Sequence, residues 1–147
     1  KGEVFDMNQQ AEKRQIITIQ SKLSNCSKLS EFLSEYIKSN NIPDEIYNDL
    51  RLVAEEVFVN IASYAYSNDG PNTVVIELSN TIDSLSIIFT DSGIAFDPLV
   101  DCNTNIETDD HCEGSMGIHI IKSLTDHQEY KRNQKHNVFT VTKHYTS

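Results

Sequence analysis

Two polar side chains in an apolar, periodic stretch of the sequence could transfer a proton and hold a cation. Glu56 and Asn60 lie four residues apart, a spacing that places both side chains on one face of a helix. A carboxylate can take a proton from a hydroxyl group, and a carboxamide oxygen suits a hard cation such as Mg²⁺. By itself such a pair is more often a solvated polar pair on a helix surface, so other residues must decide its role.

Two glycine-containing segments add groups that could bind a polar ligand. Asp91 directly follows an apolar run and precedes Gly93, which predicts a carboxylate at the end of a strand, able to accept a hydrogen bond from a ligand amine. Gly114 and Gly117 stand at the start of a helical pattern, where free backbone N–H groups can hold phosphate oxygens. Taken singly, an Asp-x-Gly turn is common, and a glycine pair before a helix is as often a flexible cap.

Regular elements must bring these segments together. Apolar residues at helical spacing predict three helices, over residues 27–39, 45–66 and 118–124. Alternating and β-rich runs predict five strands, over residues 16–19, 73–79, 84–90, 128–131 and 137–144. This order predicts an α+β fold, a two-layer sandwich in which helices cover one face of a mainly antiparallel sheet.

The longest predicted helix carries one narrow apolar stripe, which must face the sheet. The stripe consists of Ile46, Leu50, Val53, Val57 and Ile61. Because each helix residue advances by about 100°, Glu56 and Asn60 lie together at the edge of this stripe, whereas Glu55 points roughly the opposite way, into water. We therefore expect Glu56, and not Glu55, to share the rim of the core with Asn60.

Composition limits the classes of function. The chain has 147 residues, of which 38% are hydrophobic, and a net charge of −10. This size favours one domain, which we place at residues 16–147 after an N-terminal arm at residues 1–15. The acidic charge disfavours direct binding to nucleic acid or to an anionic membrane. Three widely spaced cysteines, no apolar run long enough for a membrane span and no secretion signal predict a cytoplasmic protein.

In this order, the three segments resemble the Asn box and the two glycine boxes of the GHKL (histidine-kinase-like) ATPase superfamily. The segments are Glu56-x-x-x-Asn60, Asp91-x-Gly93-x-x-Phe96-Asp97-Pro98 and Gly114-x-x-Gly117. Within the superfamily, the helix around Asn60 and the Phe-Asp-Pro ending look most like the bacterial anti-sigma factor serine/threonine kinases. The resemblance extends over residues 16–143.

The resemblance implies ATP and Mg²⁺ as cofactors and assigns roles to single residues. Asp91 would hydrogen-bond the adenine amine, Gly93 would let the purine approach, and Phe96 would belong to the same nucleotide site. Asn60 would be the Mg²⁺ ligand, and Glu56 would be the catalytic residue that polarises the attacking hydroxyl group. The residues implied around the phosphates are Gly114, Ser115, Met116 and Gly117.

The implied activity is transfer of phosphate to a serine of an anti-sigma-factor antagonist, together with sequestration of a sigma factor. These two proteins are the expected partners, and a homodimer is an open alternative to a monomer. Two other functions stay open: a nucleotide-gated binding module without phosphotransfer, and the ATPase-like domain of a larger regulatory protein.

Departures from the family pattern bear on this choice. Tyr64 stands where the family often has histidine, and Ala95 where it often has a second glycine. The predicted lid, residues 99–113, contains no lysine or arginine, although phosphoryl transfer usually relies on cations. The lid therefore favours the binding module, whereas Glu56 favours the enzyme.

A basic cluster, expected at the solvated tip of the last hairpin, consists of Lys131, Arg132, Lys135 and His136.

Overall fold

The computed structural model describes residues 13–66, 72–99 and 115–146. Within these ranges the strands form one antiparallel sheet with the order β1-β2-β3-β5-β4. The strands are β1 (Arg14–Gln20), β2 (Thr73–Asn80), β3 (Ser84–Asp91), β4 (His127–Asn133) and β5 (His136–His144). Each predicted strand is present, and each is one to three residues longer than predicted because pairing with a neighbour extends it.

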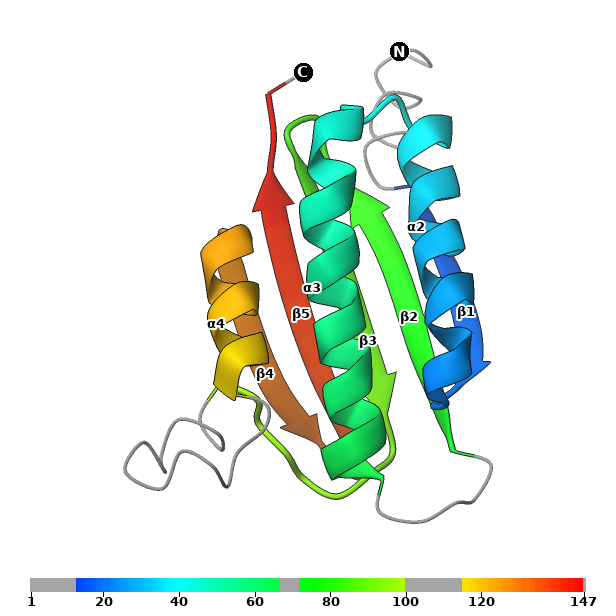
Figure 1. Cartoon of the computed structure of the whole chain (residues 1–147), viewed down its shortest axis with the longest axis vertical. Coiled ribbons are helices and arrows are strands. Elements are labelled where there is room, and N and C mark those ends of the chain that lie inside the picture. The colour runs from blue at the N-terminus through cyan, green and yellow to red at the C-terminus, as the bar shows by residue number, and fades with distance from the viewer. Residues whose placement is uncertain (1–12, 67–71, 100–114, 147) are drawn as a thin grey trace, which may run out of the picture.

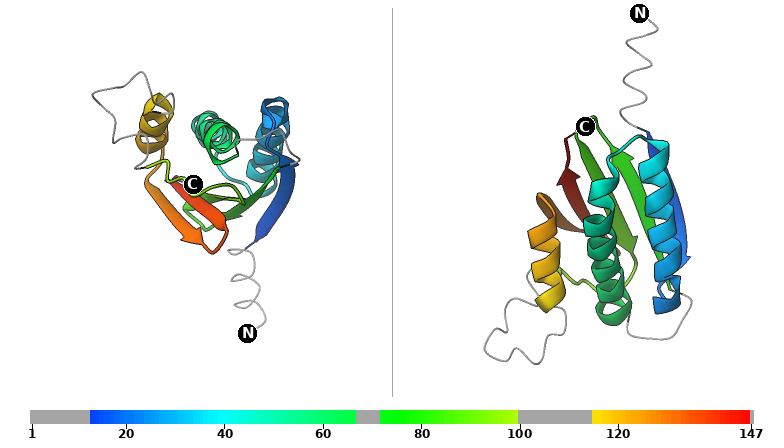
Figure 2. Two further views of the ribbon diagram at one scale, coloured as in Figure 1. Left: turned by 90° about the horizontal axis from the view of Figure 1, so that it is seen from below. Right: turned by 45° about the horizontal axis from the view of Figure 1, so that its top comes forward.

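In the part of the chain that the structure describes, three α-helices cover one face of this sheet. They are α2 (Cys26–Ser39), α3 (Tyr47–Asn60) and α4 (Ser115–Leu124). Figure 1 shows α3 over the middle of the sheet between α2 and α4, and Figure 2 shows the helices and the sheet as two separate layers. The predicted α+β two-layer sandwich is thus confirmed. Within the described residues, no helix combines the length and apolarity needed to cross a bilayer.

The longest helix differs from its prediction at both ends. Instead of one α-helix over residues 45–66, a short 3₁₀ turn at Asp44–Ile46 precedes α3, and a π-helical segment at Ile61–Ala65 follows it. The Tyr66 N–H donates to the Ile61 carbonyl at 3.2 Å, the i→i+5 bond of a π-turn. Such turns are rare and often found at functional sites. Apolar periodicity alone does not distinguish them from α-helix.

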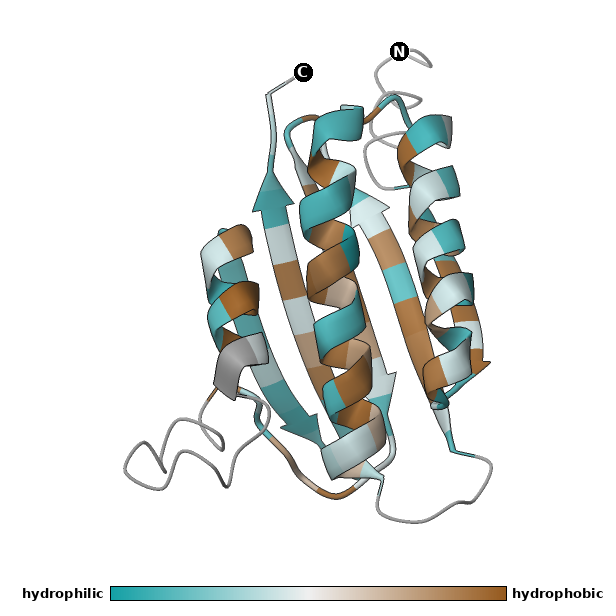
Figure 3. Ribbon diagram, viewed as in Figure 1, coloured by the Kyte–Doolittle hydropathy of each residue, from teal (hydrophilic) through white to brown (hydrophobic). Residues whose placement is uncertain are grey.

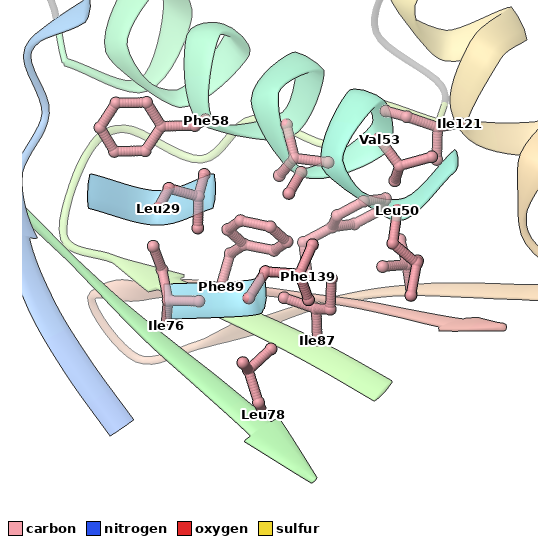
Figure 4. Packing of buried hydrophobic residues seen from close by; sticks show 14 of the residues in the cluster. Leu29, Leu50, Val53, Phe58, Ile76, Leu78, Ile87, Phe89, Ile121 and Phe139 are labelled. Atoms are coloured by element: carbon pink, nitrogen blue, oxygen red, sulfur yellow. The ribbon is translucent and has the colours of Figure 1, made fainter. Parts of the chain in front are cut away.

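The apolar stripe of α3 is buried against the sheet, as the sequence predicted. All five stripe residues are at most 6% exposed. They lie over inward-facing strand residues that include Ile76, Ile87, Phe89 and Phe139 (Figure 4). Figure 3 shows the corresponding alternation of hydrophobic and hydrophilic residues along the strands and around the helices. Burial of this stripe fixes the rotation of α3 about its own axis and therefore the direction of its polar side chains.

Leu50→Ala should lower the free energy of unfolding by about 2–5 kcal/mol, because truncating a fully buried leucine leaves a cavity. Leu50 is 0% exposed, whereas Leu52 on the same helix is 37% exposed. The matched variant Leu52→Ala should therefore cost less than about 1 kcal/mol. Urea unfolding of the two variants measures the difference. Equal losses would contradict the observed orientation of α3.

Candidate functional site

A small pocket opens where the end of α3, the loop after β3 and the start of β5 meet. Its walls are mostly apolar, and its polar groups come from one helix and three strands. The lining includes Val57 and Asn60 from α3, Asp91 from β3, Phe96 and Pro98 from the following loop, and Asn137 from β5. The structure therefore gathers in one pocket Asn60, Asp91 and Phe96, three of the residues selected from the sequence.

Asp91 is the last residue of β3, as predicted, and its side chain is buried. The residue is 3% exposed, and its Oδ1 accepts hydrogen bonds from the Gly93 N–H at 2.9 Å and from Asn137 Nδ2 at 2.8 Å. Burial raises the pKa of the Asp91 carboxyl, and these two bonds, together with the charges of Arg132 and His136, oppose part of that rise. Among the described residues, no hydrogen bond reaches Oδ2, so one oxygen remains available to a ligand.

Gly93 packs directly on the end of the π-helical segment. A Cβ added at this position would lie 2.2 Å from the carbonyl oxygen of Ala65, a contact that only a backbone shift could relieve. The neighbouring Ile94 N–H donates to the same Ala65 oxygen at 2.9 Å. The close approach of these two backbones therefore requires glycine, independently of any ligand.

Asn60 ends α3 with its side chain in the pocket. The residue is 4% exposed, and its Nδ2 is buried without a hydrogen-bond partner among the described residues. Buried polar atoms in folded proteins nearly always have a partner, and each exception calls for an explanation. Asn60 therefore brings to the pocket a buried donor that the described residues do not use.

Glu55 and Glu56 diverge, and each lies beside a different neighbouring helix. Glu56 is half-buried beside α4: a Cβ added to Gly117 would come within 2.3 Å of its Oε1. In the described part of the chain, no hydrogen bond or ion pair engages the Glu56 carboxylate. Glu55 lies on the α2 side, where its Oε2 pairs with Arg51 Nη1 at 3.2 Å. Burial and the Glu55 charge together raise the pKa of Cys26, the first residue of α2.

The predicted divergence of the two glutamates is thus present, but the expectation that Glu55 points freely into water is wrong. Its side chain is 29% exposed and ion-paired, because α2 packs beside α3 on that side. Helical spacing gives the angle between two side chains; it does not identify the helix that each one meets.

The second glycine segment is described only from the start of α4. Gly114 and the rest of the predicted lid after Leu99 lie outside the described residues. For Ser115 and Met116 the structure describes the helical backbone, which begins three residues before the predicted helix start at residue 118. Gly117 is buried in the first turn of α4, against Glu56. The fold therefore brings this segment beside the Asn-box helix.

Phe96 forms one wall of the pocket and stacks on Tyr64 of the π-helical segment. The two ring centroids lie 5.1 Å apart with an angle of 16° between the ring planes. Tyr64 occupies the position where the family often has histidine, and an offset aromatic pair adds about 0.5–1.5 kcal/mol beyond burial. The stack holds the loop after β3 against the end of the helix.

Sequence reasoning missed Asn137, and it missed the hydrogen bonds that Arg132 makes although this residue is exposed as expected. Asn137 is 3% exposed at the start of β5, and it faces inward on the same side of the strand as Phe139 and Val141. Arg132, expected at a solvated hairpin tip, donates from Nη1 to the Gly93 carbonyl at 2.9 Å and to Asn137 Oδ1 at 3.1 Å. The signal for Asn137 was a residue of low β propensity in an inward register position of a strand.

Comparison with known proteins agrees with this arrangement. Residues 19–143 match the family of the histidine kinase-like ATPase domain. The serine/threonine-protein kinase BtrW of Bordetella bronchiseptica is 28% identical over 97 residues, which cover 65% of this chain and 68% of BtrW.

The fold is similar to that of a larger solved protein. The crystal structure of the RsbU and RsbW domains of Rv1364c from Mycobacterium tuberculosis superposes with a TM-score of 0.64 and 12% identity over 89% of this chain. This chain spans only 32% of that protein. Because the family match covers most of the sequence and includes all three motif segments, the chain belongs to the histidine kinase-like ATPase domain family.

Proposed function

We propose that this protein binds ATP with Mg²⁺ in the pocket between α3 and the loop after β3, and transfers phosphate to a serine of an anti-sigma-factor antagonist. It would also sequester a sigma factor. The observation that carries the proposal is the presence, in one pocket, of the buried Asp91 carboxylate and of Asn60, whose Nδ2 has no partner among the described residues. Two buried polar groups with unused capacity fit a ligand that is polar at two places, as a nucleotide–cation complex is.

The base end of the nucleotide fits the Asp91 side of the pocket. Asp91 Oδ2 would accept a hydrogen bond from the exocyclic amine of adenine, since Oδ1 is already occupied by protein donors. The apolar lining from Val57 and Phe96 suits the faces of a purine ring.

The phosphate end fits the region between Asn60 and the start of α4. The Asn60 amide can present its oxygen by a half-turn about its terminal side-chain bond, and amide oxygen is a ligand that Mg²⁺ accepts. Backbone N–H groups in the first turn of α4 have no helical partner and favour anions. When bound, the metal ion would supply positive charge to the phosphates.

Glu56 is the carboxylate that would assist transfer. It would accept the proton of the serine hydroxyl as the serine oxygen forms a bond to the γ-phosphorus. The bond from that phosphorus to the β–γ bridging oxygen breaks, and ADP leaves with the electron pair. Glu55 is unsuited to this role because its carboxylate is held by Arg51 on the α2 side.

The partners are proposed from relatives. BtrW is named a serine/threonine-protein kinase, and the solved neighbour contains an RsbW domain beside an RsbU domain.

A second function, nucleotide-gated binding without transfer, is favoured by one observation: residues 99–113 contain no lysine or arginine. A third function also stays open, that of an ATPase-like domain within a larger regulatory protein, since the solved neighbour carries a second domain beside the one that this chain matches.

Asp91→Asn should make the fold more stable at pH 7 while weakening binding of ADP about 10- to 100-fold. Burial raises the pKa of Asp91 in the folded state above its ordinary value of 3.8. At a pH above this raised pKa, the folded protein is destabilised by a buried negative charge, which asparagine removes. The stability gained by Asp91→Asn should therefore shrink as the pH falls through the folded-state pKa towards 3.8. Urea unfolding across pH and calorimetry measure the two effects. The exposed Asp83→Asn is the control, and unchanged ADP affinity in Asp91→Asn would contradict the assignment.

Asn60→Ala should abolish most of the dependence of ATP affinity on Mg²⁺ and leave the fold intact, because Nδ2 has no partner in the described structure to lose. Titration of ATP with and without Mg²⁺ measures this dependence in the wild type and the variant. An equal Mg²⁺ effect in both proteins would rule out Asn60 as the ligand.

Glu56→Gln should retain ATP binding and reduce transfer to the cognate antagonist by about 10²–10⁴-fold, the usual contribution of a general base. Glu55→Gln is the matched control and should transfer at close to the wild-type rate. Radiolabelled phosphate on the antagonist is the readout. If Glu55→Gln is the inactive variant, the assignment is wrong. If the wild type binds ATP and labels no antagonist, the protein is a binding module.

A further inference from the structure

The side chain of Asn137 is the most heavily hydrogen-bonded group beside the pocket. Its Nδ2 donates to Asp91 Oδ1 and to the Ile94 carbonyl, both at 2.8 Å. Its Oδ1 accepts from the Phe96 N–H at 3.2 Å, from the Tyr130 hydroxyl at 2.5 Å and from Arg132 Nη1 at 3.1 Å. One buried amide thus joins β5 and β4 to the loop after β3.

These bonds use the full capacity of the amide. A carboxamide has two N–H donors and an oxygen with two lone pairs, and every one of them is engaged by the protein. Asn137 lines the pocket, yet it has no donor or acceptor left for a ligand. Its effect on binding must therefore act through the groups that it holds.

The most consequential of these groups is the Asp91 carboxylate. Asp91 Oδ1 accepts from Asn137 Nδ2 and from the Gly93 N–H, and two donors on one oxygen resist rotation of the carboxylate. Oδ2 is therefore kept as the acceptor that a ligand meets. Without the Asn137 donor, the single bond from the Gly93 N–H would leave the carboxylate plane free to rotate, and the direction of the ligand-facing oxygen would no longer be fixed.

The hairpin of β4 and β5 braces this arrangement from outside. Arg132 Nη1 donates to both Asn137 Oδ1 and the Gly93 carbonyl, so the guanidinium group of Arg132 connects the amide to the turn that presents Asp91. The Tyr130 hydroxyl bonds to the same Asn137 oxygen. Removing Arg132 should loosen the amide without emptying a core position.

We infer that Asn137, braced by Arg132, is a positioning residue that sets the preference of the pocket for a purine bearing a 6-amino group. The inference rests on the proposed binding of adenine nucleotide. It adds that selectivity for the amine depends on a residue that does not touch the nucleotide.

The test compares ADP with purine riboside diphosphate, which carries hydrogen in place of the 6-amino group. Calorimetry gives both affinities for the wild type, Asn137→Asp, Arg132→Gln and Asn133→Asp. Asn137→Asp keeps the shape of the side chain, removes its donors and sets a second carboxylate against Asp91, so Arg132→Gln, which adds no charge beside Asp91, is read together with it. Asn133→Asp makes the same chemical change at an exposed position of the same hairpin and is the matched control.

The wild type and Asn133→Asp should prefer ADP by about 10- to 100-fold, the range for a hydrogen bond to a charged group. Asn137→Asp should reduce this preference to about threefold or less, mainly through weaker binding of ADP. Arg132→Gln should reduce it about two- to tenfold. Since Arg132 is exposed, this second variant decides the question if Asn137→Asp does not fold.

Three other results would overturn the inference, and each has a different meaning. If ADP and the analogue weaken equally in the variants, Asn137 only supports the fold. If the wild type binds both ligands equally, Asp91 does not read the amine. If the wild type binds neither, the proposed nucleotide function itself is wrong.

Discussion

The packing of α3 on the centre of the sheet is the constraint on which the site depends. Its apolar stripe is buried against β2, β3 and β5, and this fixes the helix in rotation. Asn60 is then turned into the pocket, Glu56 towards α4 and Glu55 towards α2. A rotation of the helix by one residue, about 100°, would exchange these directions. The hydrophobic core is therefore also what selects the carboxylate that can act in chemistry.

A second constraint joins the helix end to the loop after β3. The Ala65 carbonyl accepts from the Ile94 N–H and leaves no space for a side chain at position 93. The Tyr66 hydroxyl accepts from the Ser92 N–H at 2.7 Å, and it donates to the Thr73 carbonyl at 2.8 Å. These contacts bring the segment after Asp91 to the helix that carries Asn60. The pocket is the space that remains between two tightly joined backbones.

The polar groups of the pocket are held at a cost to stability. Burial disfavours the ionised Asp91, and the Asn60 Nδ2 forgoes a hydrogen bond within the described structure. An unpaired buried polar atom such as Asn60 Nδ2 costs about 1–3 kcal/mol. Asp91 differs in that its Oδ1 is paired with two protein donors, so its cost comes from burial of the ionised carboxylate. Residues that weaken the fold in this way are expected where binding a ligand, and not folding alone, has determined the side chain.

The sequence by itself determined the two layers and the sheet-facing stripe of α3. It also determined the places of three polar or turn residues: Asn60 beside that stripe, Asp91 at the end of a strand and Gly93 in the turn after it. These features depend on local spacing: periods of two and of about 3.6 residues and turn residues at strand ends. Only the tertiary structure decided the partners of Glu55, the π-turn at Ile61–Ala65 and the roles of Asn137 and Arg132. Asn137 lies 46 residues from Asp91 along the chain. Such a contact follows from strand order and register, because β3 pairs with β5 and sets Asp91 opposite Asn137.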